Sequence, residues 1–354
     1  MKIVLTLLTA AALVAVTPGS SAVRTISKDV EGPEAIAVDP AGNLYVANGI
    51  TGGADGNLRD RRPGEIVVFA PNASQRSRAL LQIGDPAALM LDRSNHLYVL
   101  CNGNGVDFDA GIQEFEPGGT KTVRSIGIGD NDTEAFALDG NGNLYVGLFA
   151  KSEEQPLSVG VYRPGETAPF RTIAVEKPVH PKAGSTSGPD YDISGTALAT
   201  DAASLYVAAY KRTIADNEAA GAGSVFVYSL ASGTLQRTIT IGVHQPQALA
   251  FDGARNLYVA NGSAPGSVTV YASGATTPSR TISTGGELPA ALAFDVSGNL
   301  FIGTDASVQR FPRAGTAPDM RIPVAIKGSN FMALDRSANL FVIDGDAVRE
   351  FRTH

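Results

Sequence analysis

Seven copies of one short pattern run through the chain and constrain its fold more than any other feature. Each copy has an apolar stretch that ends in Asp, a turn rich in Gly, Asn or Ser, and then Leu, an aromatic residue and a β-branched residue. The seven aspartates, spaced 40 to 62 residues apart, are Asp39, Asp92, Asp139, Asp201, Asp252, Asp295 and Asp335. Repeats of about 40–50 residues that are rich in short strands are typical of a β-propeller.

Each copy supplies four strands, which we call a, b, c and d. In the first copy, strand a covers residues 35–39 and strand b residues 44–47, and the Gly and Asn between them suit a tight hairpin. Strands a and b are apolar almost throughout, so we expect them to be buried on both faces. Strand c reads β-branched, two residues, aromatic. Strand d is expected to begin at an arginine: Arg78, Arg124, Arg171, Arg237, Arg280 and Arg321.

The number of d strands predicts how the ring closes. Only six of them precede the end of the chain, and the seventh match is Arg24-Thr25-Ile26, near the N-terminus. This segment is expected to pair with Val348–Phe351 and complete the last blade, which removes an exposed sheet edge. The predicted fold is all-β, a seven-bladed propeller of four-stranded antiparallel blades over residues 23–354, with six blades as the alternative.

Residues 1–22 have the features of an export signal. Lys2 supplies a positive start, residues 3–16 are mostly apolar, and small residues precede a cleavage point after Ala22. The apolar run is shorter than the about 20 residues of a membrane span, although an uncleaved anchor is the alternative. We therefore predict a secreted or periplasmic protein with no membrane span once the signal is removed.

Charge and cysteine content exclude several classes of function. The formal net charge is −7, and an acidic surface argues against nucleic acid as a partner. A single cysteine excludes a disulfide framework, and Cys101 at the end of an inner strand is interpreted as a buried small apolar residue. We expect a monomer.

Loop lengths point to one face of the ring. The b-to-c loops are long in blades 1 to 4 and short in blades 5 to 7, and a long segment, residues 174–195, also precedes blade 4. These loops predict a wall on one side of the channel mouth that binds a protein, or a small-molecule or carbohydrate ligand. The alternative is neutral variation in loops that tolerate insertion.

The strand register places polar residues at the channel mouth on the same face. They are Glu34, Asn48, Glu134, Asn261, Asp305 and Asp344. Such oxygen ligands suit Ca²⁺ or another divalent cation, and a solvated rim without an ion is the alternative. The repeated aspartates lie at the opposite face, where we interpret them as residues that bond the backbone of the a-to-b turn.

The repeat itself resembles a known family. Asp-x-x-Gly-Asn-Leu-Tyr-Val-Ala-Asn, followed by Val-x-Val-Tyr and Arg-Thr-Ile, resembles NHL-type repeats and, more broadly, the gluconolactonase-like and TolB-like propeller superfamily. Members of this superfamily are often six-bladed, so the count of seven departs from the common pattern. The resemblance covers residues 23–354 and implies the fold rather than one function.

Gluconolactonase-like motifs are present in part. The resemblance implies a metal-ligand role for Glu31, in Glu31-Gly32-Pro33, and substrate contact for Asn131. Ser194-Gly195 and Gln245-Pro246-Gln247 stand where the family has its other two metal ligands, so those two ligands have no counterpart.

Two functions remain open at this stage. The leading one is a non-enzymatic binding scaffold that uses the loops of blades 1–4. The alternative is a lactone hydrolase or lyase with a divalent metal at the channel mouth, for which His180 and His244 are further acid/base candidates.

Overall fold

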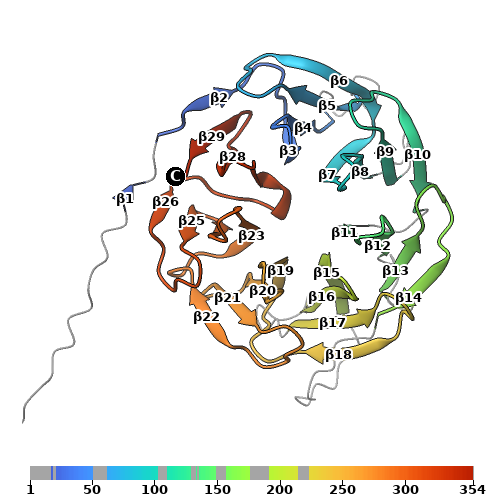
Figure 1. Cartoon of the computed structure of the whole chain (residues 1–354), viewed down its shortest axis with the longest axis vertical. Coiled ribbons are helices and arrows are strands. Elements are labelled where there is room, and N and C mark those ends of the chain that lie inside the picture. The colour runs from blue at the N-terminus through green and yellow to red at the C-terminus, as the bar shows by residue number, and fades with distance from the viewer. Residues whose placement is uncertain are drawn as a thin grey trace, which may run out of the picture.

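The computed structural model shows seven separate sheets arranged in a ring around a central axis (Figure 1). It describes residues 17–18, 21–50, 62–102, 110–128, 133, 135–148, 157–175, 191–213 and 223–353. Six sheets have four strands and the seventh has five. The seven-bladed prediction is confirmed, and the alternative of six blades is wrong.

The first four blades follow one another along the chain. Blade 1 has β3 (Pro33–Val38), β4 (Leu44–Asn48), β5 (Gly64–Phe69) and β6 (Arg76–Ile83). Blade 2 has β7 (Asp85–Leu91), β8 (Leu97–Asn102), β9 (Gly111–Phe115) and β10 (Thr122–Gly127). Blade 3 has β11 (Phe136–Leu138), β12 (Leu144–Leu148), β13 (Ser158–Tyr162) and β14 (Arg171–Ala174). Blade 4 has β15 (Tyr191–Thr200), β16 (Ser204–Thr213), β17 (Gly223–Ser229) and β18 (Leu235–Ile239).

The remaining blades bring the ends of the chain together. Blade 5 has β19 (Pro246–Phe251), β20 (Leu257–Asn261), β21 (Ser267–Tyr271) and β22 (Arg280–Ser283). Blade 6 has β23 (Pro289–Phe294), β24 (Leu300–Thr304), β25 (Val308–Phe311) and β26 (Met320–Ile322), and the short β1 (Thr17–Pro18) lies parallel to its outer edge. Blade 7 has β27 (Met332–Leu334), β28 (Asn339–Ile343), β29 (Val348–Arg352) and β2 (Arg24–Ile26), and the 3-10 turn η2 (Ser329–Phe331) precedes it.

Ring closure by the N-terminal strand is confirmed. β2 pairs antiparallel with β29, with Arg24 opposite Glu350 and Ile26 opposite Val348. Figure 1 shows the blue β2 at the outer side of the red β29. The outermost strand of the last blade therefore comes from the start of the described sequence.

The a-to-b turns are held by the repeated aspartates, as the sequence predicts. Asp39 Oδ1 accepts from the backbone N–H groups of Ala41 and Asn43 at 2.9 and 2.8 Å, and Oδ2 accepts from Asn43 Nδ2 at 2.7 Å. Gly42 completes this turn with a φ of 85°, which a residue with a Cβ rarely adopts. The same pattern returns around Asp139, Asp252, Asp295 and Asp335.

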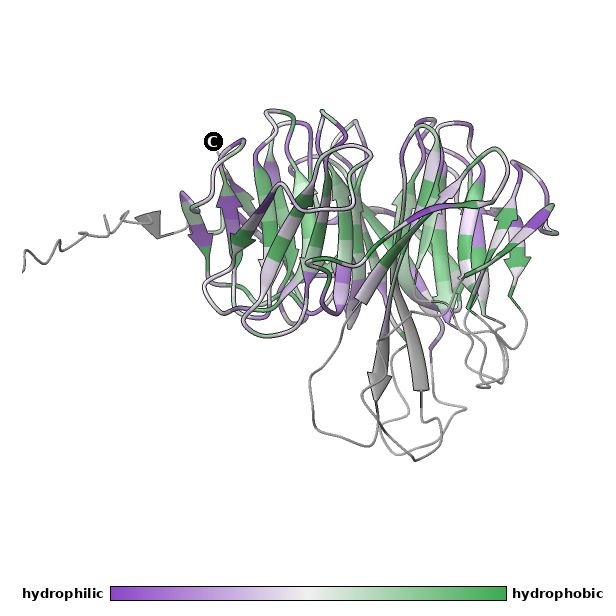
Figure 2. Cartoon of the chain, turned by 90° about the horizontal axis from the view of Figure 1, so that it is seen from below, coloured by the Kyte–Doolittle hydropathy of each residue, from purple (hydrophilic) through white to green (hydrophobic). Residues whose placement is uncertain are grey.

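The apolar core is divided among the seams between neighbouring blades. At the closing seam, Ile26 and Val348 of blade 7 belong to the same buried cluster as Val46 and Val67 of blade 1. Figure 2 shows hydrophobic residues along the strands and hydrophilic ones concentrated at the turns. Ring closure therefore buries apolar surface as well as pairing an edge.

Burial of the two inner strands differs from expectation. The b strands are buried, and in β4 every residue is. The a strands are only partly buried, since β19 alternates buried and half-buried residues before a half-buried end. Strand a is the innermost strand of its blade and lines the channel, so it has no sheet packed against its inner edge.

Four of the six predicted arginines do not open strand d. β6, β10 and β18 begin two residues before Arg78, Arg124 and Arg237. In blade 6 Arg321 is also out of register, because Met320 pairs with Arg310 as Arg280 pairs with Val270 in blade 5. The guanidinium that links this blade to the next comes instead from strand c: Arg310 donates to the backbone carbonyl of Thr353. The link between neighbouring blades is therefore kept in blade 6, although the arginine that makes it lies on strand c instead of strand d.

Candidate functional site

The two faces of the ring carry different connections. The a-to-b and c-to-d turns lie on one face, which we call the turn face. The b-to-c and d-to-a connections lie on the other, which we call the loop face. Most of the long loops expected to form the wall fall on residues 51–61, 103–109, 149–156, 176–190 and 214–222, which lie outside the described residues. The wall therefore stays a prediction.

The inner hairpin of blade 4 is longer than expected. β15 and β16 have ten residues each, and their pairing continues to Tyr191 opposite Thr213. Part of what the sequence suggested as loop, including Ser194-Gly195, is therefore strand. This hairpin extends the loop face of blade 4 with paired backbone.

A pocket of about 310 Å³ opens on the loop face of blade 1. Its lining includes Glu31, Asn48, Arg62, Glu65 and Leu81. Arg62 Nη2 lies 3.4 Å from Glu31 Oε2, and both side chains are largely exposed. Leu81 is 64% exposed, although it is a large apolar residue. The pocket thus combines an apolar wall with a charged rim, a composition typical of ligand sites.

Asn48 organises the backbone around this pocket. Its Oδ1 accepts from the Glu31 backbone N–H at 3.2 Å, and its Nδ2 donates to the Asp29 carbonyl at 3.0 Å. The side chain is buried, so these bonds fix the segment that carries Glu31.

Asn261 has the equivalent role in blade 5. Its Oδ1 accepts from the His244 backbone N–H at 2.9 Å, and its Nδ2 donates to the Gly242 carbonyl at 3.1 Å. The oxygen that could ligate a cation therefore already holds the loop before blade 5. The side chain of His244 is exposed.

Two carboxylates and a lysine influence one another at the channel mouth. The pKa of Glu34 is raised, first by burial and then by the negative charge of Asp85, while Lys327 opposes the shift. Glu34 comes from blade 1, Asp85 from blade 2 and Lys327 from the connection into blade 7. Glu34 is exposed, so its burial is only partial; a carboxyl group with a raised pKa is a common feature of functional sites.

The η2 turn reaches across from blade 7 towards blade 2. Asn330 Nδ2 donates to the Ala87 carbonyl at 3.5 Å. Farther along the rim, Asp344 Oδ2 lies 2.8 Å from Arg349 Nη2, so this carboxylate is already paired with a cation.

The remaining predicted site residues are dispersed or outside the description. Glu31 and His244 belong to the entries into blades 1 and 5, so they lie in different blades. Asn131, Glu134 and His180 lie outside the described residues. In the described part of the chain, no three His, Cys, Asp or Glu side chains group as metal ligands would.

These positions do not fit the metal-ligand set that the gluconolactonase-like resemblance implies. The carboxylate of Glu31 faces Arg62, and the oxygen of Asn261 bonds backbone. Gln245 and Gln247 supply no carboxylate, and Gln247 Nε2 donates to the Gln245 carbonyl at 3.2 Å. We therefore derive no chemistry through a metal.

Cys101 is interpreted as structural. It is 2% exposed, and burial raises the pKa of its thiol to about 12. A thiol at this pKa supplies almost no thiolate near neutral pH, which makes it a poor nucleophile.

Asp85, Lys327 and Leu81 were missed by the sequence reasoning. One of them could have been found by register. Four blades begin with a residue followed by proline at the same place in the register: Gly32-Pro33, Asp85-Pro86, Gln245-Pro246 and Leu288-Pro289. This comparison singles out Asp85 as the acidic member. Leu81 had no comparable signal, whereas Arg62 ends the basic run of residues 59–62 in the first long loop.

Among the described residues, no helix is long and apolar enough to cross a membrane.

Comparisons with known proteins support the fold and leave the function open. Residues 21–57 match the family described as strictosidine synthase-like, N-terminal, a short segment that covers β2 and the first hairpin of blade 1. No curated protein matches the chain. Among solved structures, the chain is similar to one in the crystal structure of a mitotic checkpoint complex, with 14% identity, a TM-score of 0.68 and coverage of 100% of this chain and 98% of that one. At this identity the likeness shows the propeller fold alone.

Proposed function

We propose that this propeller is an exported, monomeric binding scaffold, secreted or periplasmic, whose ligand docks on the loop face of blades 1–4. The observation that carries the proposal is the pocket on blade 1. Its volume of about 310 Å³ is within the range of about 300–1,000 Å³ usual for ligand sites. The exposed Leu81 beside the Arg62–Glu31 pair offers both an apolar contact and orienting charges.

The polar residue Asn48, which lines the pocket, supports binding rather than chemistry, because its amide holds the backbone of the segment that carries Glu31. This side of the pocket is therefore pre-organised, which lowers the entropic cost of binding. The partner is a protein, or a small-molecule or carbohydrate ligand, and not nucleic acid, because the net charge of −7 opposes a polyanion.

The test is a binding screen with matched variants. The protein is screened on a glycan array and against exported proteins, and hits are measured again with Leu81→Asp. Val296→Asp is the control, because Val296 is 74% exposed and follows Asp295 on the turn face. Loss of binding in Leu81→Asp alone supports the proposal. If every hit, protein and glycan alike, still binds Leu81→Asp, the proposal is overturned.

A second function is favoured by Glu34. Its raised pKa beside Asp85 suits a general acid for a lactone hydrolase or lyase at the channel mouth. The probe is D-glucono-1,5-lactone in a pH-stat assay, with and without added Ca²⁺. Turnover that is lost in Glu34→Gln and kept in Glu31→Gln would place the reaction at Glu34. Absence of turnover above the spontaneous rate rejects this candidate.

A further inference from the structure

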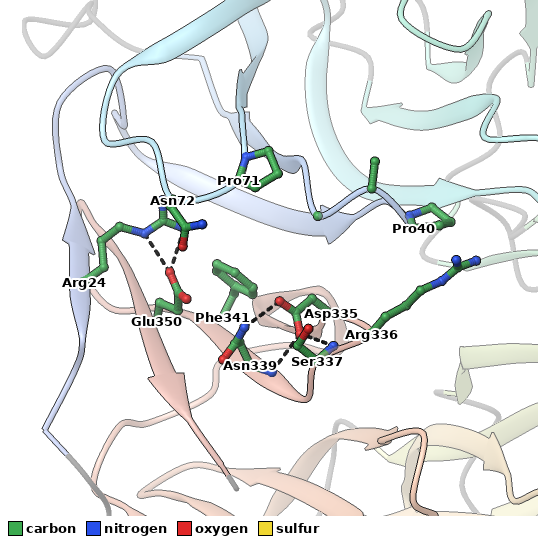
Figure 3. Close-up of a pocket in the computed structure, with 12 residues that line it drawn as sticks. Arg24, Pro40, Pro71, Asn72, Asp335, Arg336, Ser337, Asn339, Phe341 and Glu350 are labelled. Atoms are coloured by element: carbon green, nitrogen blue, oxygen red, sulfur yellow. Dashed lines mark hydrogen bonds and ion pairs between the residues drawn. The ribbon is translucent and has the colours of Figure 1, made fainter.

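A second pocket lies on the turn face, at the seam where blade 7 meets blade 1 (Figure 3). Its volume is about 200 Å³. Blade 7 contributes its a-to-b turn, Phe341, Glu350 and Arg24, and blade 1 contributes two turns that contain Pro40 and Pro71. It is on the face opposite the loops, so it is separate from the site of the proposed function.

One departure from the repeat lies at this pocket. In four blades, the aromatic residue of strand b is a tyrosine whose hydroxyl donates to Oδ2 of the turn aspartate. These bonds are Tyr45 to Asp39 at 3.4 Å, Tyr145 to Asp139 at 3.2 Å, Tyr206 to Asp201 at 2.9 Å and Tyr258 to Asp252 at 3.4 Å. In blade 7 the equivalent residue is Phe341, so no hydroxyl reaches Asp335.

The strand d arginine changes partner in the same place. Arg78, Arg237 and Arg280 each donate to the tyrosine hydroxyl of their own blade at 2.9, 3.0 and 3.1 Å. In blade 7 Arg24 instead pairs with Glu350, 2.7 Å from Nε, as Arg124 pairs with Glu114 in blade 2. In Figure 3 the Phe341 ring lies between this ion pair and Asp335. The place where a tyrosine hydroxyl would lie therefore has the Arg24–Glu350 ion pair on one side and Asp335 on the other.

Blade 6 has a phenylalanine at the same position, Phe301. There the negative charge of Asp295 contributes to the raised pKa of Arg310, after the larger effect of the Asp319 hydrogen bond. In blade 7 the strand c residue opposite Arg24 is Glu350, which carries the opposite charge.

Two groups at the pocket retain bonding capacity. Asp335 Oδ2 accepts from Asn339 Nδ2 at 2.7 Å, and no tyrosine adds a second bond. Arg336 is exposed and has no hydrogen-bond or ion-pair partner in the part of the chain that the structure describes. The pocket therefore offers an acceptor at Asp335 and donors at Arg336.

The charges around the pocket balance. Two arginines, Arg24 and Arg336, face two carboxylates, Asp335 and Glu350, so neither an anion nor a cation is favoured overall. Pro40 and Pro71 supply an apolar wall. The volume is below the about 300–1,000 Å³ of sites for drug-sized ligands, which limits the occupant to about one ring.

We propose that this pocket binds a single neutral, hydroxyl-rich ring, a hexopyranose unit, with one sugar hydroxyl donating to Asp335 in place of the missing tyrosine hydroxyl. A neighbouring hydroxyl accepts from Arg336. The C–H face of the sugar packs against the prolines of blade 1.

The test uses D-glucose, D-galactose and D-mannose as probes in ligand-observed saturation-transfer NMR. Phe341→Tyr restores the repeat and fills the space, so we expect the signal of the bound hexose to disappear. Arg336→Gln should weaken binding about tenfold, as loss of a hydrogen bond to a charged group does. Arg93→Gln is the matched control, because Arg93 follows Asp92 in the blade 2 turn as Arg336 follows Asp335, but does not line the pocket; binding should be unchanged.

The outcomes separate the proposal from its alternatives. Failure of all three hexoses to bind the wild-type chain overturns it, and so does binding that survives Phe341→Tyr and Arg336→Gln. Inorganic phosphate is the counter-probe: if phosphate binds here in an Arg336-dependent manner and the hexoses do not, the assignment to a neutral ligand is wrong. Variants on the loop face leave this pocket intact, so the two proposals can fail independently.

Discussion

Arg24 and Glu350 lie 326 positions apart in the chain and form an ion pair, with Nη2 of the arginine 2.6 Å from Oε2 of the glutamate. Their side chains are only 13% and 8% exposed. Arg24 Nη1 also donates to the Ala73 carbonyl at 2.6 Å, so the same guanidinium joins blade 7 to blade 1.

Glu350→Ala should strongly destabilise the protein. It leaves Arg24 as a buried charge without its counterion, and breaking such a pair costs about 3–5 kcal/mol. The free energy of unfolding from urea titration measures the effect. The control is Glu166→Ala, which breaks the exposed pair of Arg163 and Glu166 and should change stability by less than about 1 kcal/mol. Equal effects of the two variants would contradict a special role for the seam.

A chain that starts at Lys28 should lose the closed ring. It lacks β2, which leaves the outer side of β29 unpaired and removes Ile26 from the core of the closing seam. An open edge favours association with other chains. We expect a lower Tm and oligomers in size-exclusion chromatography, whereas a chain that starts at Val23 stays monomeric. A monomeric Lys28 chain with an unchanged Tm would refute the importance of closure.

Tyr206→Phe should destabilise blade 4 by about 1–3 kcal/mol, because it removes a hydrogen bond from each of two half-buried charged partners. The hydroxyl donates to Asp201 Oδ2 at 2.9 Å and accepts from Arg237 Nη2 at 3.0 Å. Tyr162→Phe is the control, since the Tyr162 hydroxyl has no hydrogen-bond partner within the described ranges. Urea unfolding should give a lower free energy of unfolding for Tyr206→Phe than for Tyr162→Phe. An unchanged value for Tyr206→Phe would show that the hydrogen bonds of its hydroxyl contribute little to stability.

Stability should fall as the pH rises above about 9. Burial raises the pKa of Cys101 from its ordinary 9.0 to about 12, so the folded state holds its proton while the unfolded chain loses it. The contribution of the Cys101 thiol to the free energy of unfolding is complete below pH 9. It declines towards pH 12, by up to about 1.4 kcal/mol per pH unit. Unfolding free energies at pH 8, 10 and 11 test this, and Cys101→Ala should flatten the decline.

The same thiol allows a direct chemical check. Folded protein should react with a thiol reagent at pH 8 only when it opens, and the rate should rise sharply in denaturant. Rapid reaction of the folded protein would mean that Cys101 is accessible, contrary to its burial.

Much of the fold could be predicted because it rests on local patterns. The period of the repeat, the turn aspartates and the match of Arg24-Thr25-Ile26 to other d strands are all visible in the linear sequence. Arg321 was misplaced because an arginine on strand c or on strand d can reach the next blade equally well. The pattern of one strand does not reveal that exchange, but the pairing of Arg310 with Met320 does.

The candidate site was less predictable because its members come from separate blades. Glu34 was identified from its register, yet its neighbours Asp85 and Lys327 lie far from it in sequence. Leu81 is one apolar residue among many in the strands, and only its exposure of 64% distinguishes it. Asn261 was selected as a possible ligand for its oxygen, but proximity in the sequence could not show that His244 already donates to that oxygen.

Pairing of β2 with β29 also has a consequence for biosynthesis. The first blade strand to leave the ribosome must wait for one of the last, because its partner is made some 320 residues later. During that interval Ile26 and its neighbours have no native site to occupy. Such a chain cannot complete its structure from one end to the other, and its last folding event joins its beginning to its end. Chaperones that shield an extended N-terminal segment would therefore matter more for this protein than for one whose blades each close on themselves.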